Sequence, residues 1–101
     1  MPDFATAFTV KGNERNLTHD ELIRAIRLSI ADEYEAIQVY TQIAGSTDNE
    51  LVKAVLFDIA DEEKVHAGEF LRLLSLIAPD EPKYYEKGAA EVDAQVTSFA
   101  G

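Results

Sequence analysis

Three ionisable residues, Glu33, Glu63 and His66, occupy positions where a helical pattern predicts Leu or Ile. Each lies in a stripe of apolar residues that recur every three or four positions, the spacing that keeps side chains on one helix face. We therefore expect all three side chains to point into the interior. A buried carboxylate without a partner costs several kcal/mol unless a cation or a hydrogen-bond network compensates its charge. A metal ion would supply this compensation.

The two stripes belong to separate segments of the chain. The first carries Glu33 at its centre and consists of Ile23, Ile26, Ile30, Glu33, Ile37, Tyr40 and Ala44. The second carries a Glu-x-x-His pair and consists of Val52, Leu56, Ile59, Glu63, His66, Phe70, Leu73 and Ile77. Both segments therefore bring ligand-type groups to one interior.

Capping and stop signals place the stripes on two long helices. Thr18 followed by Glu21 forms a capping box, which predicts that a helix begins near His19 and ends at Gly45. The polar residues 46–49 form a turn that also caps a second helix from about residue 50 to residue 77. Helices joined by so short a turn must lie antiparallel.

The remaining segments flank this hairpin. Pro79 and Pro82 are expected to stop the second helix, and residues 83–98 to form a short third helix. We divide the chain into an N-terminal arm (1–17), a helical hairpin (18–78) and a C-terminal short helix and tail (79–101). The fold class expected from this organisation is all-α.

Composition restricts both the metal chemistry and the partners. The 101 residues make one small domain and include no cysteine, which excludes thiolate sites and Fe–S clusters. Carboxylate and imidazole suit iron or manganese, and imidazole also suits zinc and copper, so the ligand type leaves the metal open. The net charge of −10 opposes binding to nucleic acid or an anionic membrane. With neither a signal peptide nor a membrane span in the pattern, we expect a cytoplasmic protein.

A single hairpin provides half of a four-helix metal site. Such a site uses one Glu from each of two helices and one Glu-x-x-His from each of the other two. Two copies related by a two-fold axis would supply Glu33, Glu63 and His66 from each chain. We therefore expect a homo-oligomer whose dimer forms a ferritin-like four-helix bundle, with the site on the symmetry axis.

The segment 18–77 resembles the rubrerythrin and ferritin-like group, and especially the encapsulated ferritins. The resemblance lies in residues 32–36 (DEYEA) with Tyr40 following, residues 46–48 (STD) and residues 61–67 (DEEKVHA). It implies that Glu33, Glu63 and His66 are the ligands of a di-iron ferroxidase centre that oxidises Fe(II) to Fe(III). It also implies that Asp32 and Glu35 line the path by which iron reaches this centre.

The resemblance further implies a decameric ring built from dimers, with iron stored as mineral inside an encapsulin nanocompartment in the cytoplasm. The sequence departs from the family pattern at Val39, because encapsulated ferritins can carry an aromatic residue beside the iron path and this chain has no Trp. The ending, residues 97–101, is also unlike a shell-targeting tail. Two explanations remain open: the chain is part of a longer protein, for instance one fused to a shell protein, or it acts without a shell.

Three functions therefore remain open. The first is a ferroxidase, with Mn, Zn or Ca as possible substitutes for Fe. The second is a rubrerythrin-like peroxide reductase, which the absence of a cysteine-bound rubredoxin centre disfavours. The third is a non-enzymatic helical assembly module that binds a structural ion such as Zn²⁺ or Ca²⁺. Tyr40 is predicted to pack against the bundle interior or, alternatively, to hydrogen-bond a ligand carboxylate.

Overall fold

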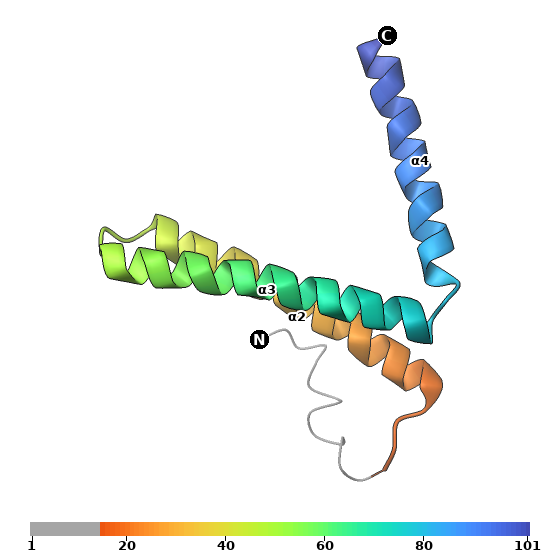
Figure 1. Cartoon of the computed structure of the whole chain (residues 1–101), viewed down its shortest axis with the longest axis horizontal. Coiled ribbons are helices and arrows are strands. Elements are labelled where there is room, and N and C mark those ends of the chain that lie inside the picture. The colour runs from red at the N-terminus through yellow and green to blue at the C-terminus, as the bar shows by residue number, and fades with distance from the viewer. Residues whose placement is uncertain (1–14) are drawn as a thin grey trace.

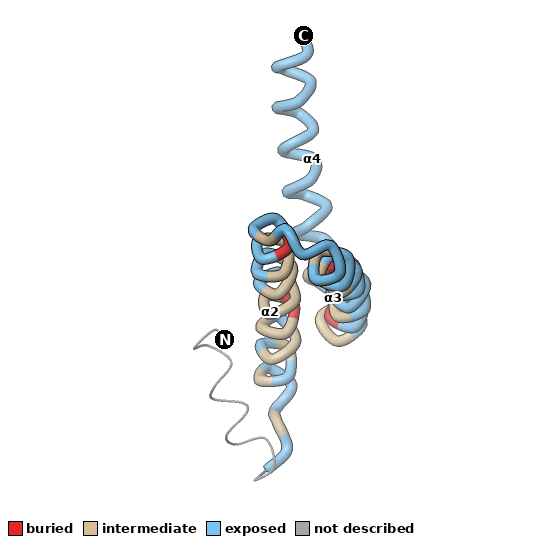
Figure 2. Tube along the Cα trace, turned by 90° about the vertical axis from the view of Figure 1, so that its left-hand side faces the viewer, coloured by how far each residue is buried: buried red, intermediate tan, exposed pale blue. Residues whose placement is uncertain are grey.

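The computed structural model describes residues 15–101, which form helices and no strand. The helices are α2 (His19–Gly45), α3 (Glu50–Ile77) and α4 (Glu81–Ala100). Helices α2 and α3 lie side by side as an antiparallel hairpin, and α4 extends away from one end of it (Figures 1 and 2). The all-α prediction is confirmed. Most of the predicted arm lies outside the described residues.

The predicted capping box starts α2. The Thr18 hydroxyl accepts a hydrogen bond from the backbone N–H of Glu21 at 3.2 Å, and the Glu21 carboxylate accepts one from the Thr18 N–H at 2.9 Å. Arg15 donates to both oxygens of the same carboxylate, at 2.6 and 2.7 Å. The hydrogen bond from Arg15 is the larger cause, and that from the Thr18 backbone the next, of a pKa of Glu21 that is lowered to about 2. Arg15 therefore joins the start of α2 to the residues before it.

The turn between α2 and α3 also follows the prediction. Asn49 caps α3, because its side-chain oxygen accepts a hydrogen bond from the Val52 N–H at 3.1 Å. Helix α3 ends at Ile77, before Pro79.

The expectation that Pro82 helps to stop α3 was wrong, because Pro82 lies in the first turn of α4, where a missing N–H costs nothing. Helix α4 is 20 residues long and exceeds the predicted range 83–98 at both ends.

Three alanines, together with Ile30 and Leu74, form the buried core of the hairpin. The buried residues of α3 are Ala60, Ala67 and Leu74, each seven positions after the last, and those of α2 are Ile30 and Ala44. Short side chains allow two helix backbones to approach closely. The predicted stripe of α3 lies beside this buried row, so its Leu73 remains 42% exposed. The hairpin thus has an open apolar face that a single chain leaves uncovered.

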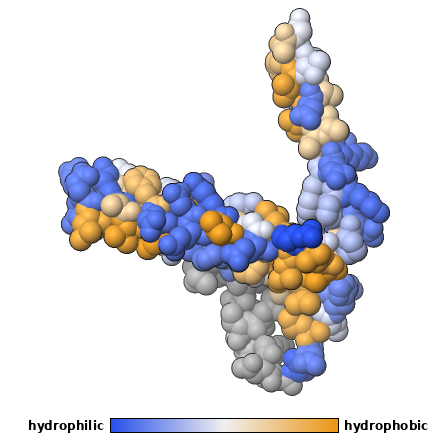
Figure 3. All heavy atoms as spheres, viewed as in Figure 1, coloured by the Kyte–Doolittle hydropathy of each residue, from blue (hydrophilic) through white to orange (hydrophobic). Residues whose placement is uncertain are grey.

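Helix α4 touches the hairpin only near its first turn. The Glu81 carboxylate accepts hydrogen bonds from Arg27 of α2 and from the hydroxyl of Tyr85. Beyond this contact the helix has no buried residue, and Phe99 near its end is 93% exposed. Figure 3 shows apolar side chains along the outer part of this helix. None of the described helices is long and apolar enough to cross a membrane.

Candidate metal centre

The three predicted ligand residues meet near the middle of the hairpin. Glu33 comes from α2, and Glu63 and His66 come from successive turns of α3. One donor atom from each residue lies within 4.8 Å of the other two. Nδ1 of His66 is 3.7 Å from Oε2 of Glu33 and 3.6 Å from Oε2 of Glu63. The structure therefore brings Glu33 next to two residues that lie 30 and 33 positions later in the sequence.

The spacing of these atoms suits a shared cation. The distances exceed those of hydrogen bonds, so the groups do not satisfy one another directly. Donor atoms that bind one ion at about 2.1 Å lie about 3.0–3.5 Å apart. The distances from His66 to Glu33 and to Glu63 exceed this range by one or two tenths of an ångström, and all three donor atoms lie within 4.8 Å of one another. Two carboxylates and one imidazole form a donor set typical of iron and manganese.

The surroundings of Glu33 favour a bound cation. Its Oε2 is inaccessible to solvent and has no hydrogen-bond partner in the described part of the chain. Burial raises the pKa of Glu33 above its ordinary value, and the neighbouring Glu63 raises it further, whereas His66 lowers it. A cation bound here would remove the cost of the buried charge. The residues present therefore fit a metal ion.

The expectation that all three side chains point into the interior needs one correction. The side chains of Glu33 and Glu63 are 15% and 19% exposed, but that of His66 is 48% exposed. The cause is the shifted contact between the helices: Ala60 and Ala67 face α2, and the ligand stripe lies on the open face beside them. In one chain the site is therefore walled on one side only.

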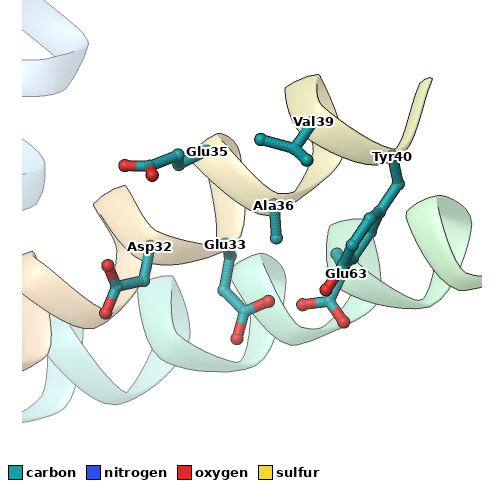
Figure 4. A pocket seen from close by; sticks show the side chains of 7 residues that line it. All are labelled: Asp32, Glu33, Glu35, Ala36, Val39, Tyr40 and Glu63. Atoms are coloured by element: carbon teal, nitrogen blue, oxygen red, sulfur yellow. The ribbon is translucent and has the colours of Figure 1, made fainter. Parts of the chain in front are cut away.

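A hollow of about 360 Å³ lies against the two carboxylates (Figure 4). It is lined by Asp32, Glu33, Glu35, Ala36, Val39, Tyr40 and Glu63. Figure 4 shows the Glu33 side chain extending from α2 toward α3, where Glu63 lies, whereas Glu35 points to the outer side of α2. The structure thus brings both predicted access residues and Tyr40 to the same hollow as two of the predicted ligand residues.

The residues lining this hollow differ in their surroundings. Oδ1 of Asp32 is inaccessible to solvent and lacks a hydrogen-bond partner among residues 15–101, whereas Glu35 is exposed. Tyr40 is half-buried. Val39, where the family resemblance would lead us to expect an aromatic residue, also borders the hollow.

A second hollow of about 450 Å³ lies on the other side of Glu33. It is lined by Glu33, His66, Glu69, Phe70 and Leu73. Glu69 was absent from the predicted site. The signal that could have found it is the spacing, since Glu69 continues the series Glu63, His66 by three more positions.

A helical hairpin with one Glu on its first helix and Glu-x-x-His on its second is typical of ferritin-like carboxylate proteins. The profile of the Rubrerythrin family matches residues 24–100, and the chain therefore belongs to the rubrerythrin family. Its fold matches the crystal structure of the encapsulated ferritin domain from Pyrococcus furiosus, with a TM-score of 0.77 and 38% identity. The match covers 79% of this chain and 82% of that one.

Two curated relatives carry names of the same kind. The chain is 37% identical over 84 residues to a ferritin-like-encapsulin shell fusion protein of Pyrococcus furiosus, and 40% identical over 86 residues to the encapsulin nanocompartment cargo protein EncC of Myxococcus xanthus. These alignments cover 83% and 85% of this chain, but 24% and 65% of the relatives. The predicted resemblance to encapsulated ferritins is confirmed.

Proposed function

We propose that this protein is a ferroxidase, which oxidises Fe(II) to Fe(III) at a di-iron centre formed between two copies of the chain. The observation that carries the proposal is the cluster of Glu33, Glu63 and His66, in which a buried carboxylate oxygen lacks a partner. Membership of the rubrerythrin family and the similarity to an encapsulated ferritin domain support iron as the substrate.

Charge balance supports a centre made from two copies. One chain offers two carboxylates and one imidazole. Two chains would offer four carboxylates, whose charge equals and opposes that of two Fe(II) ions. Pairing the open faces of two hairpins would also cover half-exposed apolar residues such as Ile59 and Phe70 beside the ligands. Burial and neutralisation would therefore favour the same dimer.

The carboxylates and the imidazole would have different tasks in this reaction. The carboxylates of Glu33 and Glu63 bind Fe(II) and stabilise the additional positive charge of Fe(III). Neutral Nδ1 of His66 donates a lone pair without adding charge. Two Fe(II) ions lose one electron each, and these two electrons with two protons reduce O₂ to hydrogen peroxide, or hydrogen peroxide to water.

Asp32 and Glu35 would attract hydrated Fe(II) to the hollow beside the ligands. Both are carboxylates of α2 at the margin of that hollow, and the net charge of −10 favours cations over the whole surface. Tyr40 borders the same space, where it would pack against a ligand carboxylate or donate a hydrogen bond to it.

The names of the relatives support a location, and the family resemblance suggests the assembly. Because one relative is a fusion with an encapsulin shell and another is an encapsulin cargo protein, we propose that this protein also works with an encapsulin compartment in the cytoplasm. The oligomer would be a decameric ring of dimers. Such a ring does not enclose mineral, so storage would belong to the shell.

The family match also supports a second candidate, a peroxide reductase with the same ligands. The two activities differ in the oxidant and in the need for a reductase. Peroxide-dependent turnover with an added reductase, and slow oxidation of Fe(II) by O₂, would favour this candidate.

An anaerobic Fe(II) titration followed by exposure to air tests the ferroxidase. We expect saturable binding near one iron per chain and fast formation of the ferric absorbance. Glu63→Ala should lose both, while Glu62→Ala, which removes an exposed carboxylate from the adjacent position, should keep both. Oxidation in the wild type no faster than that of free iron would contradict the proposal and favour a structural ion.

A further inference from the structure

We propose that Glu69 is a positioning residue, whose carboxylate accepts a hydrogen bond from Nε2–H of His66 and thereby holds Nδ1 toward the metal. This inference rests on the proposed function, because it concerns the same site. Its basis is the orientation of the ring: Nδ1 is the nitrogen that faces both Glu33 and Glu63. Nε2 is therefore the nitrogen left for another partner.

Metal binding at Nδ1 requires the proton of neutral imidazole to be on Nε2. Histidine ligands almost always donate this second N–H to a carboxylate, a carbonyl or water, which fixes both the tautomer and the ring orientation. Because the His66 side chain is 48% exposed, the hairpin alone does not fix its ring by packing. A hydrogen-bond acceptor near Nε2 would supply that constraint.

Glu69 is the carboxylate that shares the second hollow with His66. Its oxygens lie more than 4.0 Å from the ring nitrogens of His66 in this structure, so the proposed bond requires a rotation of the Glu69 side chain. It follows His66 by three residues on α3, and helical side chains lean toward the N-terminus, so Glu69 lies over the turn that carries His66. The same lean brings His66 toward Glu63, in agreement with the 3.6 Å distance between them.

Among the residues that line this hollow, Glu69 is the one carboxylate that does not face Nδ1 of His66. Besides Glu33, which faces Nδ1, the other lining residues are the apolar Phe70 and Leu73. Glu69 has no ion pair or hydrogen bond among the described residues, and the nearby Arg72 is directed to Ser75. Glu69 is therefore available to His66. When a second copy covers the open face, loss of water would strengthen the bond.

The test measures Co(II) affinity, because Co(II) binds the same donor types and is not oxidised by air during the titration. Untagged wild type, Glu69→Ala, Glu69→Gln and Glu63→Ala are compared with Glu62→Ala. The last removes the same charge from an exposed residue one heptad before Glu69. We expect Glu69→Ala to weaken binding about 10- to 100-fold. Glu69→Gln should lose less, because its amide oxygen still accepts a hydrogen bond.

A side-chain ¹⁵N NMR spectrum of the Zn(II)-loaded protein gives a second readout. The chain has two histidines, so His19→Gln assigns the signals of His66. We expect a protected Nε2–H signal in the wild type that Glu69→Ala loses. If Glu69→Ala binds Co(II) as tightly as Glu62→Ala does, the inference is wrong, although the proposed function stands. If Glu63→Ala also leaves the affinity unchanged, the proposed site itself is wrong and the inference falls with it.

Discussion

The buried carboxylate of Glu33 should make the metal-free protein less stable than a variant that lacks the charge. We predict that Glu33→Gln raises the free energy of unfolding at neutral pH in the presence of EDTA. The amide keeps the shape of the side chain and removes the charge from an oxygen that has no partner. The variant should at the same time lose the metal-binding step.

The magnitude follows from the burial of the group. A buried polar group without a partner costs about 1–3 kcal/mol, and more if it is charged. The Glu33 side chain retains 15% exposure, and His66 nearby offsets part of the charge, so we expect a gain near the lower limit, about 1 kcal/mol. For a domain of this size, 1 kcal/mol raises Tm by roughly 4–8 °C.

The pH dependence has a definite sign. Because burial raises the pKa of Glu33, the folded wild type binds this proton more tightly than the unfolded chain does. The contribution of Glu33 to stability is therefore fully present below its unfolded pKa and is lost as the pH rises through its folded pKa. Glu33→Gln does not titrate here, so its advantage should be small in acid and should grow toward neutral pH.

Urea unfolding monitored by circular dichroism, at one protein concentration and several pH values, measures this difference. Glu35→Gln is the matched control, because it removes an exposed carboxylate from the same helix. A Glu33→Gln protein that is less stable than the wild type in EDTA, or whose advantage does not change with pH, would refute the reasoning. Added Co(II) should reverse the order, since only the wild type gains stability by binding.

Three further predictions concern the interface and the helix ends. Metal should promote dimerisation, and Glu33→Ala and His66→Ala should weaken this coupling; sedimentation with and without Fe(II) measures it, and an identical distribution throughout would contradict the interfacial site. Arg15→Ala should shift acid unfolding to higher pH, because the low pKa of Glu21 provides stability above about pH 4.5 that is lost as the pH falls toward 2; exposed Arg24→Ala is the control. Glu81→Ala should speed hydrogen exchange in α4 while α2 and α3 keep their protection, because Glu81 joins Arg27 to Tyr85; unchanged exchange would argue against this contact.

The helix ends of the hairpin were predictable from the sequence because each has a local signal. Thr18 with Glu21 sets the start of α2, and Asn49 sets the start of α3, through hydrogen bonds within a few residues. The presence of Glu33, Glu63 and His66 in otherwise apolar stripes also predicted correctly that their side chains lie close together. The prediction for Pro82 failed because proline is common both just after the end of a helix and in the first turn of the next helix.

The helix contact itself was harder to predict. Hydrophobic periodicity selects the largest apolar residues, whereas α3 meets α2 through Ala60 and Ala67, which are weak hydrophobic signals. Glu69 escaped detection for a related reason. It lies beside the apolar stripe rather than in it, so it interrupts no pattern, and only the orientation of the His66 ring makes it relevant.

The use of small residues at the helix contact has a consequence for the site. Ala60 and Ala67 allow α2 and α3 to lie close together. The larger side chains of the neighbouring stripe, which includes Glu63 and His66, therefore lie beside this contact, toward the open face. An Ile row at the contact would instead have covered those side chains within one chain. Close packing inside the hairpin thus leaves the predicted ligand residues and the apolar surface on a face that the proposed second copy would cover. The same feature that makes the single chain incomplete therefore makes a site between two chains possible.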